Sequence, residues 1–181
     1  MGILVFIVIL VIILLAISTY NNLIIKRNRV RNAWAQIDVQ LRKRFDLIPN
    51  LVETVKGYAK HEAGTLEAVV KARNQYISAG TPEDMMKANT EMTGALGRLF
   101  AVAESYPDLK ANSNFMELQG ELTSIEEKIA YARQFYNDTV LMHNNAIQVF
   151  PANIFAGVFG FREEPFFKAE ENERQNVKVQ F

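Results

Sequence analysis

Residues 2–20 read GILVFIVILVIILLAISTY, and no charged side chain occurs between Gly2 and Ile25. A helix needs about 20 apolar residues to cross the hydrocarbon core of a bilayer. We therefore predict a membrane-spanning helix within an anchor formed by residues 1–25, with the aromatic residue at its end placed near the interface. The span is represented by Ile3, Phe6, Leu10, Leu14 and Tyr20.

Four basic residues follow the apolar run directly, namely Lys26, Arg27, Arg29 and Arg31. Basic residues next to a span are retained on the cytoplasmic side. This pattern predicts a single-pass membrane protein with the N-terminus outside and the bulk of the chain cytoplasmic. The same charges could also attract anionic lipid headgroups, although a topology signal is the simpler interpretation.

The helix is predicted to continue beyond the basic cluster as one long rod. Apolar residues recur in steps of three and four, which is typical of one face of a helix. This face comprises Val30, Trp34, Ile37, Leu41, Phe45 and Ile48. Asp46 is a good N-cap and Pro49 suits a first turn, so we predict that one helix ends near Phe45 and another begins at Asp46. A kinked continuous helix is the alternative.

Three further amphipathic segments follow. The second helix is predicted to reach Ser78, after which Gly80 would supply a left-handed C-cap and Thr81 an N-cap. The third is predicted over Pro82–Ser105. The fourth has the cleanest pattern, because apolar residues from Phe115 to Phe150 alternate in steps of three and four. The predicted fold is all-α: an up-and-down antiparallel four-helix bundle over residues 26–151, continuous with the transmembrane helix.

The C-terminal segment, residues 152–181, is predicted to be an irregular aromatic tail. Aromatic residues occur without a clear period, and exposed aromatics in a polar tail are costly. We therefore expect the tail to dock on the bundle or on a neighbouring chain. The candidate interaction residues are Phe155, Phe159, Phe161, Phe166, Phe167 and Phe181.

The sequence offers no recognisable set of catalytic or cofactor-binding residues. The chain has no cysteine, which excludes disulfides and thiol chemistry. A di-metal carboxylate bundle needs Glu-x-x-His pairs, but Tyr58 and Val140 precede the two histidines by three residues. The basic run Arg42–Arg44 has no second basic cluster with aromatics to suggest nucleic acid. We expect no catalytic, cofactor or metal residues and no nucleic-acid partner.

Some residues allow a structural and a functional interpretation. His143 lies on the fourth apolar stripe, where a buried histidine hydrogen-bonded to a neighbour or to the tail is the default and a catalytic or pH-sensing role the alternative. Trp34, Tyr58, Tyr136 and Phe150 could line a pocket, but their spacing favours packing in the core.

Residues 28–62 read NRVRNAWAQIDVQLRKRFDLIPNLVETVKGYAKHE, and this stretch resembles the signature of the LemA family. The segments Phe150-Pro-Ala-Asn, Phe159-Gly-Phe161 and Val177-Lys-Val-Gln-Phe181 are similar to the family's pattern, although a proline usual before the terminus is absent here. The resemblance covers essentially the whole chain. It implies a bacterial single-span protein with an antiparallel four-helix bundle, and no catalytic residues, because the family's molecular activity is not established.

We therefore expect a membrane-anchored, non-enzymatic scaffold or interaction protein at the bacterial inner (cytoplasmic) membrane. Its expected partners are the lipid bilayer, further copies of itself and a possible unidentified membrane protein. Self-association is expected through the water-soluble part, because the span lacks a small-xxx-small packing face. Two alternatives remain open: a coat that remodels the membrane or organises lipids, and an adaptor for a membrane protease.

Overall fold

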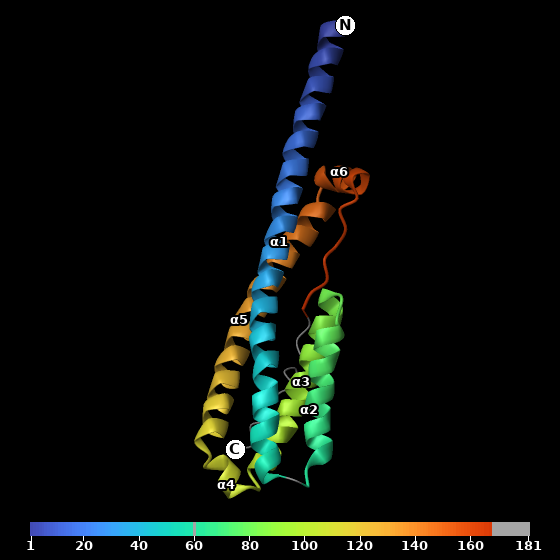
Figure 1. Ribbon diagram of the computed structural model, residues 1–181. Coiled ribbons are helices and arrows are strands. Elements are labelled where there is room, and N and C mark those ends of the chain that lie inside the picture. Colours follow the sequence, from blue (N-terminus) through green and yellow to red (C-terminus); the bar gives the residue numbers. More distant parts are fainter. Residues whose placement is uncertain (60, 168–181) are drawn as a thin grey trace, which may run out of the picture. The chain divides into compact units, whose positions relative to one another are not determined.

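The computed structural model describes residues 1–59 and 61–167, and the fold within this range is all-helical, without a β-strand (Figure 1). A long N-terminal helix is followed by two helices of intermediate length, a single helical turn, a second long helix and a short last helix. These elements are α1 (Gly2–Tyr58), α2 (Ala63–Ser78), α3 (Pro82–Ala103), α4 (Pro107–Lys110), α5 (Ser113–Gln148) and α6 (Ala152–Phe159).

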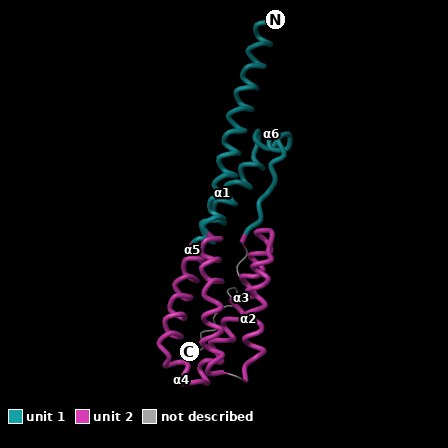
Figure 2. The backbone as a smooth tube through the Cα atoms, viewed as in Figure 1, with its two compact units in different colours: residues 1–36, 132–166 teal, residues 37–131, 167–181 magenta. Residues whose placement is uncertain are grey.

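The chain forms two compact units (Figure 2). Unit 1 comprises residues 1–36 and 132–166, and therefore contains the start of α1, the end of α5 and all of α6. Unit 2 comprises residues 37–131 and, among the described residues, Phe167. Helices α1 and α5 each contribute to both units.

Helix α1 passes through Pro49 without ending, so the predicted break between Phe45 and Asp46 is wrong and the continuous helix is right. A proline inside a helix costs about 3 kcal/mol, because its ring removes the N–H that would bond four residues back. The apolar stripe explains why the helix tolerates this cost. Phe45, Ile48, Leu51 and Val55 are all buried on both sides of the proline, and breaking the helix there would interrupt that face.

The connection between α2 and α3 confirms one predicted cap and refutes another. The Thr81 hydroxyl accepts a hydrogen bond from the Asp84 amide at 3.2 Å, and Pro82 opens the helix behind it. Gly80, however, has no left-handed conformation, because the chain leaves α2 through an extended Ala79. Helix α3 ends at Ala103, two residues earlier than predicted.

The N-terminus of α5 is capped by the polar turn before it. The Asn112 side chain accepts a hydrogen bond from the Phe115 amide at 3.0 Å, satisfying one of the N–H groups that a first helical turn leaves without a partner. The alternating stripe of α5 is largely buried as predicted. The buried members are Phe115, Leu122, Ile125, Ile129, Tyr136, Thr139 and His143.

Unit 2 buries apolar residues from each of its helices. Leu41, Ile48, Leu51, Val69, Met92 and Leu99 are fully or almost fully buried. The ring of Phe45 from α1 stacks on that of Tyr76 from α2, with centroids 4.0 Å apart and an angle of 9° between the planes. Phe100 of α3 meets Phe115 of α5 edge to face at 6.2 Å. These contacts join α1 to α2 and α3 to α5.

Unit 1 has a small core of its own, formed by Leu23, Ile147, Ala156 and Phe161. Leu23 lies in α1, Ile147 in α5 and Ala156 in α6, and Phe161 follows α6 by two residues. The expectation of an irregular chain from Ala152 onward is wrong for the first eight residues, which form α6. This helix ends at Gly160, whose φ of 71° is left-handed and favours glycine.

Candidate functional site

The predicted span lies in the first half of α1, and its side chains are exposed around the whole helix. The most apolar 18-residue window has a mean hydropathy of 3.2, and none of it is buried. Ile3, Phe6, Leu10, Leu14 and Tyr20 are all exposed. By length and composition, this is one helix able to cross a membrane among the described residues.

The four basic residues after the span do not all point into solvent. Arg29 and Arg31 are exposed, whereas Lys26 and Arg27 are half-buried. The Arg27 guanidinium lies over the Phe161 ring, 5.1 Å from its centroid. A cation over an aromatic face is attracted by the ring quadrupole, so Arg27 helps to hold the segment after α6 against α1.

The segment 161–166 lies against α5, whose side chains bind its backbone and the Glu163 carboxylate. Asn144 binds Glu164 twice: its side-chain N–H donates to the Glu164 carbonyl at 3.0 Å, and its oxygen accepts from the Glu164 amide at 2.9 Å. The Tyr136 hydroxyl donates to the Pro165 carbonyl at 2.9 Å, and Gln148 donates to the Glu163 carboxylate at 2.6 Å. Side chains of α5 thus replace the partners that a strand would find in a sheet.

His143 completes this set. Its ring is fully buried, and Nε2 lies 3.0 Å from the Arg162 carbonyl oxygen, to which only an N–H can donate. The default interpretation of His143, a buried histidine hydrogen-bonded to the tail, is confirmed. The Nδ1 atom has no hydrogen-bond partner among the described residues, so His143 contributes to this site as a donor through Nε2.

The candidate aromatic residues have different environments. Phe161 and Phe167 are buried, Phe155 is half-buried, and Phe159 and Phe166 are exposed. Phe159 and Phe161 contact Tyr20 of α1 edge to face, with centroids 4.9 and 6.0 Å away. Phe181 lies outside the described residues.

The predicted core packing of four aromatic residues is right for Tyr136, which is buried, whereas Trp34 is half-buried. Trp34 meets Tyr136 edge to face at 5.7 Å, inside unit 1. Phe150 is 80% exposed, and Tyr58 is also exposed, so neither packs in a core. Phe150 lies two residues beyond the end of α5 at Gln148 and is therefore no longer on the helical stripe that its spacing predicted.

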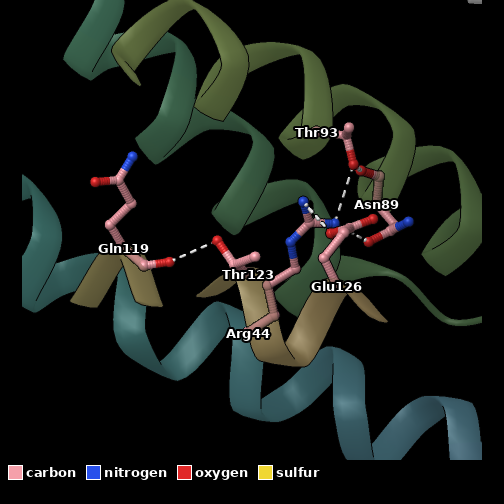
Figure 3. A network of polar contacts seen from close by, with 6 residues as sticks. All are labelled: Arg44, Asn89, Thr93, Gln119, Thr123 and Glu126. Atoms are coloured by element: carbon pink, nitrogen blue, oxygen red, sulfur yellow. Dashed lines mark hydrogen bonds and ion pairs between the residues drawn. The ribbon is translucent and has the colours of Figure 1, made fainter. Parts of the chain in front are cut away.

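A buried arginine in unit 2 was missed by sequence reasoning (Figure 3). Arg44 is 3% exposed, donates to Asn89 at 2.6 Å and Thr93 at 3.0 Å, and forms an ion pair with Glu126 at 2.7 Å. The arginine joins three helices, α1, α3 and α5. A signal was available, because Arg44 stands three residues after Leu41 and four before Ile48, on the apolar face of the helix.

A second polar contact in unit 2 involves Tyr76, whose hydroxyl donates to the Asp38 carboxylate at 3.0 Å. Arg42 pairs with the other oxygen of Asp38 at 2.7 Å. Burial, together with the hydrogen bond to the negative carboxylate, raises the pKa of Tyr76 to about 12. The tyrosine therefore stays neutral at physiological pH and acts as a hydrogen-bond donor joining α2 to α1.

Unit 2 also has an open groove of about 800 Å³ between the end of α1 and α2. Its lining combines apolar side chains, including Val52, Leu66 and Val70, with the charged side chains of Lys56, Glu67 and Lys71. Apolar concavities with a few polar groups are typical of binding sites. This groove was not predicted, because its lining residues are spread over the predicted helix face and its edges.

The chemistry available in the described part of the chain is limited. Residues 1–59 and 61–167 contain no group of three or more histidine or acidic side chains that could hold a metal ion. The structural features therefore define a class: an all-helical protein with an N-terminal helix of membrane-spanning length and with exposed apolar surfaces. They do not define a reaction.

The comparisons with known proteins give the family. The LemA family profile matches residues 33–181. The protein named LemA from Metamycoplasma hominis is 26% identical over 161 residues, which is 87% of this chain and 72% of that protein. Magnetosome protein MamQ 2 of Paramagnetospirillum magneticum is 24% identical, and magnetosome protein MamQ of Magnetospirillum gryphiswaldense is 23% identical.

The matches to the two magnetosome proteins cover 82% of this chain and 64% of each relative. The chain thus spans less than two thirds of the length of these relatives. Because the family profile matches most of the chain, this chain belongs to the LemA family. The family and the apolar helix together indicate a membrane-associated protein.

Proposed function

We propose that this chain is a membrane-anchored, non-enzymatic scaffold that associates with further copies of itself through its water-soluble part. The first half of α1 would cross the bacterial inner membrane, with the N-terminus outside, because Arg29 and Arg31 follow the span and remain exposed. The segments of α1, α2, α3 and α5 in unit 2 would form the up-and-down four-helix bundle that the sequence predicts.

The observation that supports self-association is the groove of unit 2. Val70 in its lining is exposed, and so is Ile77, which lies on the same helix. Its charged residues are of both signs, Lys56 and Lys71 against Glu67. A surface that contains both partners of an ion pair can be complementary to itself across a two-fold axis. A second copy is therefore the occupant that we propose for the groove.

The described tail residues contribute less to this proposal than the sequence suggested. Phe161 and Phe167 are already buried within the chain. Phe166 is exposed and could extend an interface. The groove on α1 and α2 is accordingly the better place to test self-association.

The experiment compares the mass of the full-length protein in lipid nanodiscs with that of two charge variants. Val70→Asp places a carboxylate in the groove, and Met116→Asp places one at an exposed apolar position on α5, outside the groove. We expect a defined oligomer for the wild type and for Met116→Asp, and a smaller species for Val70→Asp. A monomeric wild type, or an oligomer unaffected by Val70→Asp, would contradict this proposal.

The same preparation distinguishes the two alternatives. A membrane-remodelling coat would change the shape of liposomes at high surface density, and electron microscopy would detect the change. A protease adaptor would be monomeric and would be crosslinked to another membrane protein in cells. A scaffold of identical copies is expected to do neither.

A further inference from the structure

The second uncharged stretch of the chain lies far from the span in sequence. Residues 139–161 contain no Asp, Glu, Lys or Arg, although 22% of the whole chain is charged. The stretch includes the end of α5, the turn at Pro151 and all of α6. Charged residues return directly afterwards with Arg162, Glu163 and Glu164. A segment of this length that faced water would ordinarily contain charged residues, so the uncharged composition of residues 139–161 indicates a different environment.

The apolar residues of this stretch are turned outward. Ala156 is the buried residue of α6, at 3% exposure, whereas Val158 is 75% exposed. Four further apolar side chains around it are exposed as well. We call the set the α6 surface; it consists of Val149, Phe150, Ile154, Val158 and Phe159. Single exposed apolar residues are common, but several large ones within one uncharged segment indicate an interaction surface.

The contacts of unit 1 place this surface beside the end of the predicted span (Figure 1). Phe159 lies against Tyr20, with ring centroids 4.9 Å apart. Leu23 of α1 packs with Ala156 and Phe161. A bilayer core of about 30 Å takes about 20 helical residues, so a span that begins at Ile3 ends near Asn22. Helix α6 therefore contacts α1 at the depth where acyl chains meet headgroups.

We propose that α6 is a second membrane element of this protein, an interfacial helix whose apolar surface is immersed in the same leaflet that the span leaves near Tyr20. The occupant of the α6 surface is thus lipid. The reason is that the α6 surface adjoins the span: Phe159 contacts Tyr20, and Tyr20 directly follows the exposed apolar side chains of the span along α1. No charged residue occurs on α1 until Lys26, beyond this contact.

The local backbone suits this environment. In lipid, a polar backbone group without a partner is costly. The Asn153 amide donates to the Val149 carbonyl at 2.9 Å, and the Phe161 amide donates to the Ala156 carbonyl at 3.0 Å, so both ends of the short helix have capping bonds. Interfacial helices bury an apolar face by about 5–10 Å while their polar groups remain at the headgroups. Arg27, over Phe161, has the position of such a polar group.

The test uses the absence of cysteine from the chain, which makes single-cysteine labelling clean. Full-length Ile154→Cys and Val158→Cys receive a nitroxide label and are reconstituted in vesicles of phosphatidylethanolamine and phosphatidylglycerol. The collision rates of the label with oxygen, which concentrates in lipid, and with a water-soluble nickel chelate are measured. Ile9→Cys serves as the span control, and Phe135→Cys, at an exposed apolar position of α5 in the same unit, as the matched control.

We expect the ratio of oxygen to nickel collisions at Ile154 and Val158 to exceed that at Phe135 several-fold and to approach that at Ile9. Bimane on the same cysteines should be quenched by lipids with brominated acyl chains, which gives an independent measurement. A ratio at both α6 positions equal to that at Phe135 would overturn the proposal.

Two other results would also overturn it. Labels shielded from both oxygen and nickel would mean that protein, such as a second copy, covers the surface. A water-like ratio at Ile9 as well would refute the span and α6 together. Loss of the oligomer in Val70→Asp has no bearing on these ratios, so failure here and failure of the proposed scaffold are distinguishable.

Discussion

The two halves of α1 are both rich in apolar residues, yet they differ in how these are distributed around the helix. From Ile3 to Ile17 nearly every side chain is apolar and exposed. From Ile37 to Val55 the buried apolar residues occur once or twice per turn, between charged and polar ones. A helix that is apolar all round is suited to lipid, and one with an apolar stripe is suited to packing against other helices. One uninterrupted helix thus combines a half whose surface is suited to lipid with a half that packs against other helices.

This difference predicts that equal truncations in the two halves have unequal effects. Leu41→Ala removes a fully buried side chain and should lower the free energy of unfolding by about 2–5 kcal/mol, through lost burial and a residual cavity. Chemical denaturation of the reconstituted protein, followed by Trp34 fluorescence, measures the change. Leu10→Ala and Val39→Ala, both at exposed positions, are the controls. A similar loss in all three variants would contradict the comparison.

Arg44 and Arg42 of α1 allow the same comparison between a buried and an exposed position for a charged side chain. Arg44→Ala leaves Asn89, Thr93 and Glu126 without the buried guanidinium. We expect a loss of about 1–3 kcal/mol, because buried polar groups lose their partner while Glu126 remains partly hydrated. Replacing Arg42, whose side chain is largely exposed, by alanine should cost much less, because an exposed ion pair contributes little to stability.

Arg44→Met is the second variant in this experiment. It restores the apolar contacts of the side chain without its charge, and a buried ion pair can often be replaced in this way without loss. If Arg44→Met were as unstable as Arg44→Ala, the hydrogen bonds rather than packing would account for the effect. Equal stability of Arg42→Ala and Arg44→Ala would refute the structural role of Arg44.

The hydrogen bonds between α5 and the segment 161–166 give a further local prediction. Asn144→Ala removes both hydrogen bonds to the Glu164 backbone and should cost about 1–2 kcal/mol of local stability. Hydrogen exchange of the Glu164 amide is the measurement, because this amide donates to Asn144. Asn145→Ala, at the exposed position next to it, should leave that exchange rate unchanged. Equal protection in both variants would contradict the role of Asn144.

The smallest effect at neutral pH concerns Tyr76. Its pKa is raised from 10.0 to about 12 in the folded protein, so above pH 10 the folded chain binds more protons than the unfolded chain. Stability should therefore fall as pH rises from about 10 to about 12. Tyr76→Phe should flatten this decline, whereas Tyr131→Phe, at an exposed position, should not. The free energy of unfolding as a function of pH gives the comparison.

The parts of the fold that were predictable depend on neighbours in sequence. The apolar stripes of α1, α3 and α5 and the Thr81 cap involve residues within a turn or two of one another. The predicted break between Phe45 and Asp46 is wrong, because it rested only on the local preferences of Asp46 and Pro49. The packing of Ile48, Leu51 and Val55 against other helices compensates for the lost hydrogen bond, and that packing is not a local property.

The candidate site was predictable in outline and not in its contacts. The span, the basic residues and the aromatic positions were identified from the sequence, and His143 was expected to be hydrogen-bonded to a neighbour or to the tail. The Arg44 cluster was missed because Asn89 and Glu126 are 45 and 82 residues away in the chain. The pairing of Asn144 with Glu164 was missed because an extended segment without periodicity carries no signal of its partner.

For this protein, composition and periodicity determined the apolar helix and the all-helical class, and the motif in residues 28–62 indicated the family, because each is encoded in residues close together along the chain. The tertiary structure decided which polar side chains are buried, that α1 continues through Pro49, and that α6 lies against Tyr20 with its apolar residues outward. These outcomes depend on contacts between segments that are far apart in the sequence. A local cost, such as the hydrogen bond lost at Pro49, can be compared with the packing that offsets it only when those contacts are known.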